Sequence, residues 1–390
     1  MPGQGACAAL LPSPGLPYPR RMHTRLLLAF ALVALAVGRP AASSEPFKLG
    51  TFEHDGHEII GIVLRDRFAI DLGAANRSLE RRQPLWVTLP MPVDMRELIG
   101  RYEMGMRDRI HAIVDAVAPA IGTDAQPSYV HDLDDLYLLP PVRPSTILSA
   151  ALNYRAHAEE MTTGTAADMS DASALDDSPV SMDHFWERDP SDTRQNPYLF
   201  LKPSSIVIAS GQPILMKPKR EQIDWECEFA VVIGQPASHV PLDEAGDHIF
   251  GYTLMNDVGD REGRGDNRYG SDWLVWKSSD TFAPLGPFIV PKEFVQDPQA
   301  LDISFRLSGE LMQDANTSLM AHDVYELVQF VSNNLILHPG DIIATGTPGG
   351  VGYARTPPIF MKPGDVAACS VEGIGTLTNP VRLWLDVMPR

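Results

Sequence analysis

The chain has 390 residues, of which 44% are hydrophobic and 21% are charged, with 34 prolines and 30 glycines. This length exceeds one average domain, and the composition is typical of a loop-rich mixed fold. The formal net charge of −18 argues against nucleic acid as a partner. An anionic substrate would therefore need a local group of cationic side chains.

Residues 1–43 have the layout of a secretory signal peptide. Three arginines within residues 20–25 precede the apolar run 26–37, and small residues at 41–44 follow it. About twelve apolar residues are too few to span a bilayer, so no stable membrane insertion is expected after the leader is removed. The layout predicts an exported protein, periplasmic or secreted, whereas a mis-assigned start would leave a cytoplasmic one.

Residues 47–140 are predicted to form a small β-rich N-terminal domain. Apolar residues recur at strand spacing in 59–63 and 68–72, and a helical stretch is expected near residues 95–118. A proline pair then marks the boundary to a second domain, residues 141–390. Short apolar runs separated by Pro-Gly and Gly-Gly pairs predict that this second domain is mostly β and lacks βαβ repeats.

A strand-like run ends at Asn153, and His157 and Glu160 follow it at helical spacing. Residues three apart on a helix are neighbours, so this imidazole and carboxylate can hydrogen-bond. Such a dyad can take a proton from water near neutral pH, because the carboxylate orients the ring and stabilises its charged form. A surface His–Glu pair without a catalytic role is the alternative.

The segment 161–196 is an insertion that is rich in Asp, Ser and Ala and has little periodicity. It begins directly after Glu160. This composition is typical of a surface loop, and long loops beside active sites often close on ligand. The segment is therefore interpreted either as a mobile surface loop or as a lid over bound substrate.

Glu226 and Glu228 precede a buried apolar run, and Asp257 follows the next one. Side chains alternate between the faces of a strand, so the two glutamates share a face and Cys227 points away. Buried carboxylates need a partner that offsets their desolvation, and oxygen ligands alone favour Mg²⁺, Mn²⁺ or Ca²⁺ over Zn²⁺. A solvated strand face is the alternative. Cys227 and Cys369, the two cysteines after the leader, form no disulfide framework, and Cys227 is interpreted as a small core residue.

Two later motifs complete a pattern: Trp-Lys-Ser-Ser-Asp-Thr-Phe at 276–282 and a glycine-rich segment at 339–352. Together with the earlier motifs, they resemble the fumarylacetoacetate hydrolase family from about Leu138 to the C-terminus, in the family's own order. The resemblance implies a mixed α+β, mostly β fold. In this fold a catalytic domain of rolled mixed β-sheets follows the small N-terminal domain.

The resemblance also implies roles for particular residues and a cofactor. The matching positions are the metal ligands Glu226, Glu228 and Asp257, the catalytic residues His157, Glu160 and Lys277, and the substrate-binding residues Arg261 and Thr347. The implied cofactor is Mg²⁺ or Mn²⁺, with Ca²⁺ as an alternative. Asn153 stands where the branch that cleaves fumarylacetoacetate has an aspartate, which favours the acylpyruvase-like and oxaloacetate decarboxylase-like branch.

The implied function is metal-dependent hydrolysis of a C–C bond in a 1,3-dicarbonyl or 2-oxo acid of the acylpyruvate or fumarylpyruvate type, through a metal-bound enolate. Oxaloacetate decarboxylation and isomerisation of a 2-hydroxyhepta-2,4-diene-1,7-dioate, as in the catabolism of aromatic compounds, use a similar enolate, so the motifs leave the reaction open. A catalytically silent, metal-stabilised binding protein is a further alternative. The expected partner is a small anionic acid, and the resemblance implies a homodimer.

Overall fold

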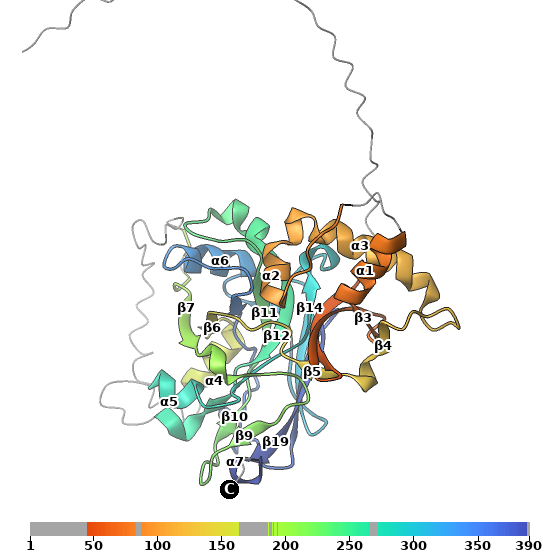
Figure 1. The fold of residues 1–390 in the computed structure, drawn as a ribbon. Helices are drawn as coiled ribbons and strands as arrows, with labels where there is room; N and C mark the ends of the chain where they lie inside the picture. Colours follow the sequence, from red (N-terminus) through yellow and green to blue (C-terminus); the bar gives the residue numbers. More distant parts are fainter. Residues whose placement is uncertain are drawn as a thin grey trace, which may run out of the picture. The chain divides into compact units, whose positions relative to one another are not determined.

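The computed structural model describes most of the chain from residue 45 onward, all within one unit (Figure 1). The described ranges are 45–82, 87–163, 186, 189, 191–192, 194–264 and 272–387. The predicted leader, residues 1–43, lies outside them. Most of the insertion at 161–196 also lies outside the described residues, and the lid hypothesis with it.

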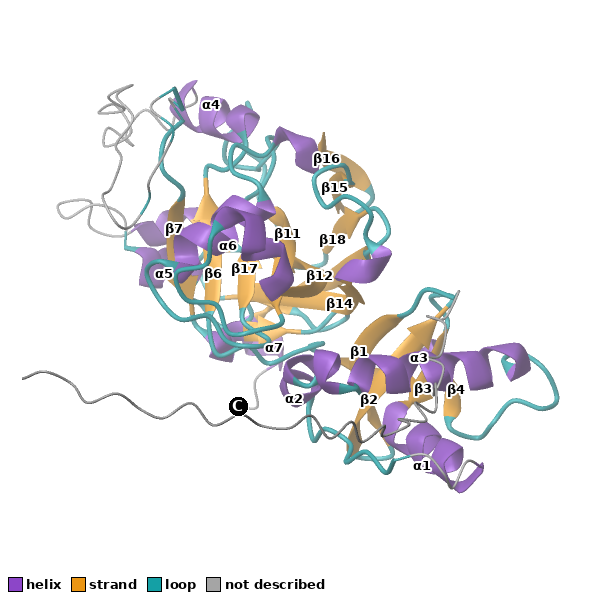
Figure 2. Cartoon of the chain, turned by 90° about the horizontal axis from the view of Figure 1, so that it is seen from above, coloured by secondary structure: helices purple, strands orange, loops and turns teal. Residues whose placement is uncertain are grey.

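The first part of the fold is an antiparallel sheet with helices beside it (Figure 2). Its elements are β1 (Lys48–His54), β2 (His57–Leu64), β3 (Phe68–Asp71), α1 (Leu72–Arg82), α2 (Met95–Gly100), α3 (Met106–Val117), β4 (Val130–Asp132) and β5 (Tyr137–Leu139). Asp55 and Gly56 connect β1 to β2 with φ values of 50° and 74°, as a two-residue hairpin turn requires. The stretches predicted as strands fall in β2 and largely in β3, and α2 and α3 form the expected helical stretch.

The central part of the fold extends this sheet. Its elements are β6 (Ile147–Ala151), α4 (Arg155–Thr163), β7 (Tyr198–Lys202), β8 (Val207–Ile208), β11 (Cys227–Ile233), β12 (Ile249–Asn256), α5 (Trp273–Lys277), β14 (Ala283–Pro291), α6 (Val324–Ser332) and β17 (Ile342–Ala344). Among the described residues, twelve strands form one sheet with the central order β1-β14-β12-β11-β17-β6-β7. Because Leu49 of β1 pairs with Ile289 of β14, the N-terminal strands belong to this sheet. A domain boundary at residue 140 stays a prediction.

A smaller sheet and a two-stranded ribbon complete the fold. Their strands are β9 (Ile214–Met216), β10 (Ile223–Asp224), β13 (Gly259–Asp260), β15 (Asp302–Leu307), β16 (Glu310–Asn316), β18 (Val366–Val371) and β19 (Gly375–Leu383), and α7 (Trp384–Val387) follows β19. The smaller sheet has the order β16-β15-β18-β19-β9, and β10 pairs with β13. Most strand pairs are antiparallel, but β6 runs parallel to β17, β8 to β14 and β9 to β19. The structure therefore confirms a mixed, mostly β fold.

The apolar run 229–233, predicted as a buried strand, lies in β11, whose seven residues are all buried. β11 has a partner on each side, β12 and β17, and apolar side chains from both sheets cover it. Polar side chains at the end of such a strand are carried into the interior and must find partners there. Within the part of the chain that the structure describes, no helix has the length and apolar character needed to cross a membrane.

Candidate metal centre and active site

The three acidic residues predicted as metal ligands meet where β11 begins and β12 ends. Cys227 pairs with Asn256 across the two antiparallel strands, so Glu226 and Asp257 become neighbours. The backbone N–H of Asp257 donates to the carbonyl oxygen of Glu226 at 2.8 Å. Carboxylate oxygens of Glu226, Glu228 and Asp257 all lie within 4.8 Å of one another, and all three side chains are buried. The structure thus brings together the residues that the sequence pattern selected.

The electrostatics of this cluster suit a divalent cation. Burial and the neighbouring carboxylates of Asp257 and Glu226 raise the pKa of Glu228 well above its usual range. Burial opposes the charge of Glu226 as well, but Lys277 and Arg261 outweigh burial and hold its pKa below the usual range. The repulsion at Glu228 is what a bound cation would relieve, and a hard ion prefers a set of carboxylate oxygens. The residues present therefore fit Mg²⁺, Mn²⁺ or Ca²⁺.

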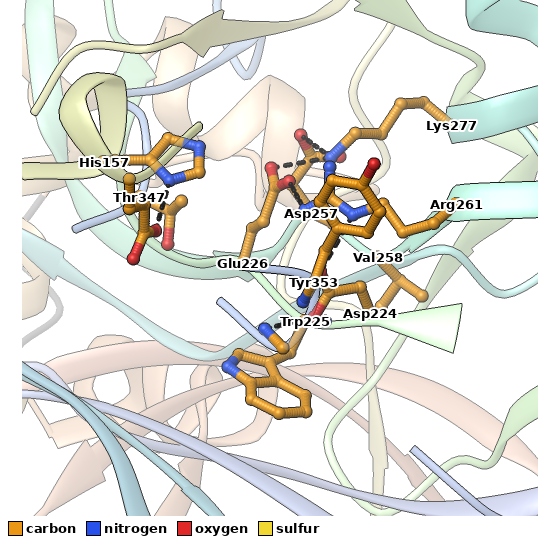
Figure 3. Close-up of polar contacts among 12 residues, drawn as sticks. His157, Asp224, Trp225, Glu226, Asp257, Val258, Arg261, Lys277, Thr347 and Tyr353 are labelled. Carbon is orange, nitrogen blue, oxygen red and sulfur yellow. Dashed lines mark hydrogen bonds and ion pairs between the residues drawn. The ribbon is translucent and has the colours of Figure 1, made fainter. Parts of the chain in front are cut away.

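The buried basic side chains of Lys277, Arg261 and Lys202 contact the carboxylates. Figure 3 shows Lys277 and Arg261 beside Glu226 and Asp257. Lys277 Nζ lies 2.6 Å from Oε2 of Glu226 and 2.9 Å from Oδ2 of Asp257. Arg261 Nη2 donates to Oε1 of Glu226 at 2.9 Å. Lys202, on β7, places Nζ 2.5 Å from Oδ1 of Asp257. Although burial lowers the pKa of Lys277, the charges of Asp257 and Glu226 raise it overall, so this lysine stays protonated at neutral pH.

His157 and Glu160 form the hydrogen bond that their spacing predicts. Nδ1 of His157 lies 2.8 Å from Oε1 of Glu160 on α4. The other oxygen of Glu160 accepts from the backbone N–H of Gly350 at 2.8 Å, which ties the helix to the glycine-rich segment. His157 is buried, so the pair is not a surface contact. Because Nδ1 is held by Glu160, Nε2 is the ring nitrogen that can exchange a proton with a ligand.

Thr347 lies in the loop that follows β17, directly beside the ligand strand. Its hydroxyl donates to the carbonyl oxygen of Cys227 at 3.0 Å and accepts from Nε2 of Gln313 at 2.8 Å. The side chain of Gln313 also accepts from the backbone N–H of Cys227 at 3.2 Å. Gly346, at φ +92°, leaves no room for a side chain, because a Cβ there would lie 2.8 Å from the Cβ of Asn153. The loop is therefore fixed against β11 and the start of α4.

A cavity of about 750 Å³ opens onto these groups. Its wall includes His157, Glu226, Arg261, Lys277 and Thr347. Three further lining residues, Phe200, Trp273 and Trp276, form an aromatic stack. The ring centroids of Phe200 and Trp273 are 4.3 Å apart, and those of Trp273 and Trp276 are 4.8 Å apart. A small anionic molecule would meet cations and a proton-accepting ring on one side of this cavity and apolar ring faces on another.

Sequence reasoning missed several residues that the structure places at the site. Lys202 is one of them, and a lysine at the end of an apolar strand such as β7 is a signal that it has a buried partner. Asp224 and Gln313 carried no signal, since their partners are distant in the sequence. Cys227 is buried, as expected of a small core residue, but it is also disulfide-bonded to Cys369 on β18, a pairing that the sequence did not predict.

Comparison with known proteins places this site in a family. Residues 146–382 match the family model of the fumarylacetoacetate hydrolase C-terminal domain. The chain is 36% identical over 245 residues to the mitochondrial oxaloacetate tautomerase Fahd2a of Rattus norvegicus. The matched region covers 63% of this chain and 69% of the rat protein. The prediction of an exported protein is contradicted by such relatives, since the rat protein and a Bos taurus relative are both named mitochondrial. Basic residues followed by an apolar run do not by themselves determine a compartment.

Two solved structures extend the comparison. A 5-carboxymethyl-2-hydroxymuconate delta-isomerase from Mycobacterium smegmatis is 35% identical with a TM-score of 0.51, covering 66% of this chain and 86% of that one. A fumarylacetoacetate hydrolase from Exiguobacterium antarcticum is 28% identical with a TM-score of 0.61, covering 86% and 99%. These are enzymes, which sets aside the alternative of a catalytically silent binding protein. The chain therefore belongs to the fumarylacetoacetate hydrolase family and is an enzyme.

Proposed function

We propose that this enzyme moves a proton between the keto and enol forms of a small 2-oxo dicarboxylic acid of the oxaloacetate type. The observation that carries the proposal is the placement of His157, held by Glu160, on the same cavity as Glu226 and Lys277. Enolisation needs a proton-accepting group and a cation that stabilises the enolate oxygen. The names of the rat tautomerase and the mycobacterial isomerase support the same class of reaction.

The metal ligands in this proposal are Glu226, Glu228 and Asp257. Their oxygen-only donor set favours Mg²⁺ or Mn²⁺, with Ca²⁺ as the alternative. The bound ion supplies a Lewis acid that polarises the substrate oxygens and so acidifies the neighbouring C–H group.

The protein's own residues then carry out the proton transfer. Nε2 of His157 takes the proton from the carbon next to the keto group, and Glu160 stabilises the imidazolium that forms. The C–H electron pair forms the C=C bond as the C=O electron pair moves to oxygen, where Lys277 stabilises the negative charge until a proton arrives. Arg261 binds a substrate carboxylate, and Thr347 lines the cavity beside it. For Thr347 to bind the carboxylate as well, its hydroxyl hydrogen turns from the carbonyl oxygen of Cys227 to the substrate. The reverse sequence returns the proton to carbon.

Hydrolysis of an acylpyruvate is the second candidate, and the same dyad favours it. An imidazole oriented by a carboxylate can deprotonate water for attack on the distal carbonyl, after which the C–C bond breaks and the enolate of pyruvate leaves. Tautomerisation needs only a substrate proton at Nε2 of His157, whereas hydrolysis also needs a water molecule beside it. The names of the rat tautomerase and the mycobacterial isomerase support placing tautomerisation first.

The test compares reactions in one sample with Mg²⁺. Deuterium uptake at C3 of oxaloacetate in heavy water is followed by NMR together with pyruvate formation, and cleavage of acetylpyruvate and fumarylpyruvate is assayed in parallel. We expect fast deuterium uptake with little pyruvate and slow cleavage. Cleavage faster than deuterium uptake would establish the hydrolase instead, and pyruvate formed as fast as deuterium enters would establish a decarboxylase.

A further inference from the structure

Asp224 joins two parts of the site that are far apart in the sequence. Its Oδ2 accepts from Nε of Arg261 at 2.8 Å and from the backbone N–H of Tyr353 at 3.0 Å. Its Oδ1 accepts from the backbone N–H groups of Gly352 at 2.8 Å and Trp225 at 2.9 Å. Asp224 has no exposed surface and, unlike Arg261, does not line the cavity. It is therefore placed to act on the site through other residues.

The glycine-rich segment reaches Asp224 through its backbone alone. A Cβ at Gly352 would lie 1.9 Å from the carbonyl oxygen of Ile359 and 2.7 Å from Oδ1 of Asp224. The position accordingly requires glycine, because any side chain would push the loop away from the carboxylate. The two backbone N–H groups of 352–353 are then satisfied by a charged acceptor, the stronger kind of hydrogen bond.

Arg261 carries the link on to the carboxylate cluster (Figure 3). While Nε is held by Asp224, Nη2 donates to Oε1 of Glu226 at 2.9 Å. The guanidinium carbon lies 5.2 Å from the ring centroid of Trp276 and 5.4 Å from that of Tyr353. A long side chain that is held at Nε and between two ring faces loses its rotational freedom in the folded state, before any ligand binds.

We propose that Asp224 is a positioning residue, which holds the Arg261 guanidinium and the 352–353 backbone in the arrangement that receives a substrate carboxylate. The inference rests on the proposed function in that Arg261 binds the substrate anion. Asparagine cannot take this role. Both oxygens of Asp224 accept from N–H groups, so the amide nitrogen of asparagine would face N–H donors whichever way it is turned.

The experiment is a double-mutant cycle on binding of oxalate, a planar dianion similar to the enolate of a 2-oxo acid. Affinity is measured by calorimetry with Mn²⁺ for the wild type, Asp224→Asn, Arg261→Gln and the double variant. We expect each single variant to lose about tenfold in affinity, the loss of one charged hydrogen bond. The double variant is expected to lose no more than Arg261→Gln, because Asp224 acts through that residue.

Asp341→Asn is the matched control. Asp341 is equally buried and accepts hydrogen bonds from Ser145, Thr146 and His338, but it contacts neither Arg261 nor the 352–353 backbone. Its variant is expected to keep the oxalate affinity of the wild type. Should Asp224→Asn not fold, Arg261→Lys tests the same link, since lysine keeps the charge but has no Nε–H donor, and about a tenfold loss is again expected.

Three outcomes would overturn the inference: additive losses in the double variant, an equal loss in Asp341→Asn, or wild-type affinity in Arg261→Lys. Failure of the Mn²⁺-loaded wild type to bind oxalate would overturn it as well, because Arg261 would then receive no anion. Coupled oxalate binding without turnover of oxaloacetate would instead contradict the proposed function and leave the role of Asp224 supported.

Discussion

At the scale of single residues, Glu228 shows how burial prepares the site for a cation. It lies at full burial beside two other carboxylates, and its pKa is raised by that burial and by Asp257 and Glu226. Glu226, two residues earlier, has its pKa lowered, because Lys277 and Arg261 outweigh its burial. The pKa values of two glutamates only two residues apart are therefore shifted in opposite directions by their neighbours, a difference that no local pattern encodes.

The raised pKa of Glu228 predicts a pH dependence of stability in the metal-free protein. Between the unfolded-state value, about 4.3, and the raised folded-state value, the folded protein holds a proton that the unfolded chain releases. The free energy of unfolding therefore falls as pH rises through this window. Glu228→Gln has no group that titrates at this position, so its stability lacks this pH dependence. As pH rises above about 4.3, the thermal midpoint of the metal-free wild type is expected to fall by a few degrees relative to that of the variant. A constant difference across the pH range would contradict this.

His157 is expected to serve turnover and not ligand binding. His157→Gln should lower kcat for the substrate by roughly 100-fold or more, the usual contribution of a general acid–base group. Oxalate affinity with Mn²⁺ should stay close to that of the wild type, because the anion is held by other residues. Glu160→Gln should likewise lower kcat and leave the oxalate affinity close to that of the wild type. Glu159, an exposed neighbour on α4, provides the matched control, and Glu159→Gln should keep the kcat of the wild type.

At the scale of elements, the site depends on how β11 is held between its neighbours. β12 places Asp257 beside Glu226, and the loop after β17 places Thr347 against Cys227. Behind the strand, Cys227 is bonded to Cys369 of β18, which joins the two sheets. The ligand-bearing strand is thus fixed by hydrogen bonds at its edges and by a covalent bond from the smaller sheet.

This disulfide is expected to contribute strongly to stability, because its cysteines are 142 residues apart. Closing so long a loop restricts the unfolded chain by up to about 5 kcal/mol in the chain-entropy description. Denaturant unfolding with and without dithiothreitol measures this difference. The wild type should unfold at lower denaturant concentration under reducing conditions, while Cys369→Ala should show the same midpoint in both. Coincident wild-type curves would show that the bond contributes nothing.

At the scale of the whole molecule, the site is a meeting point of segments from residue 153 to residue 353. α4, β10, β11, β12, α5 and the loop after β17 each supply part of it. The carboxylate cluster itself forms only when β11 and β12 are paired in the folded sheet. A ligand of that cluster therefore binds the folded state and not the unfolded chain. Binding should consequently stabilise the entire fold.

Metal binding is accordingly expected to raise the thermal midpoint of the protein. At a free Mn²⁺ or Mg²⁺ concentration about 100 times the dissociation constant, the gain in free energy of unfolding is about 2.7 kcal/mol. EDTA should reverse the shift, and Glu226→Gln should abolish it. Glu310→Gln, at an exposed position of β16, is the control and should keep the shift. An equal shift in the Glu226 variant would place the cation elsewhere.

Features that depend on near neighbours in the chain could be predicted from the residues alone. The period of two in an extended chain predicted that Glu226 and Glu228 share a face, and helical spacing predicted the contact of His157 with Glu160. Order and residue type along the chain were enough for the family and its mostly β fold. Each of these follows from backbone geometry within a few residues.

Other features of the site depend on contacts between residues far apart in the chain and became visible only in the folded protein. Lys202 meets Asp257 and Asp224 meets Arg261 across more than thirty residues, and Cys227 meets Cys369 across 142. Such pairs are set by which strands become neighbours and not by spacing in the chain. The charge of a buried group depends on these distant partners through desolvation and Coulomb interaction, and this is why the pKa difference between the two glutamates became visible only in the folded molecule.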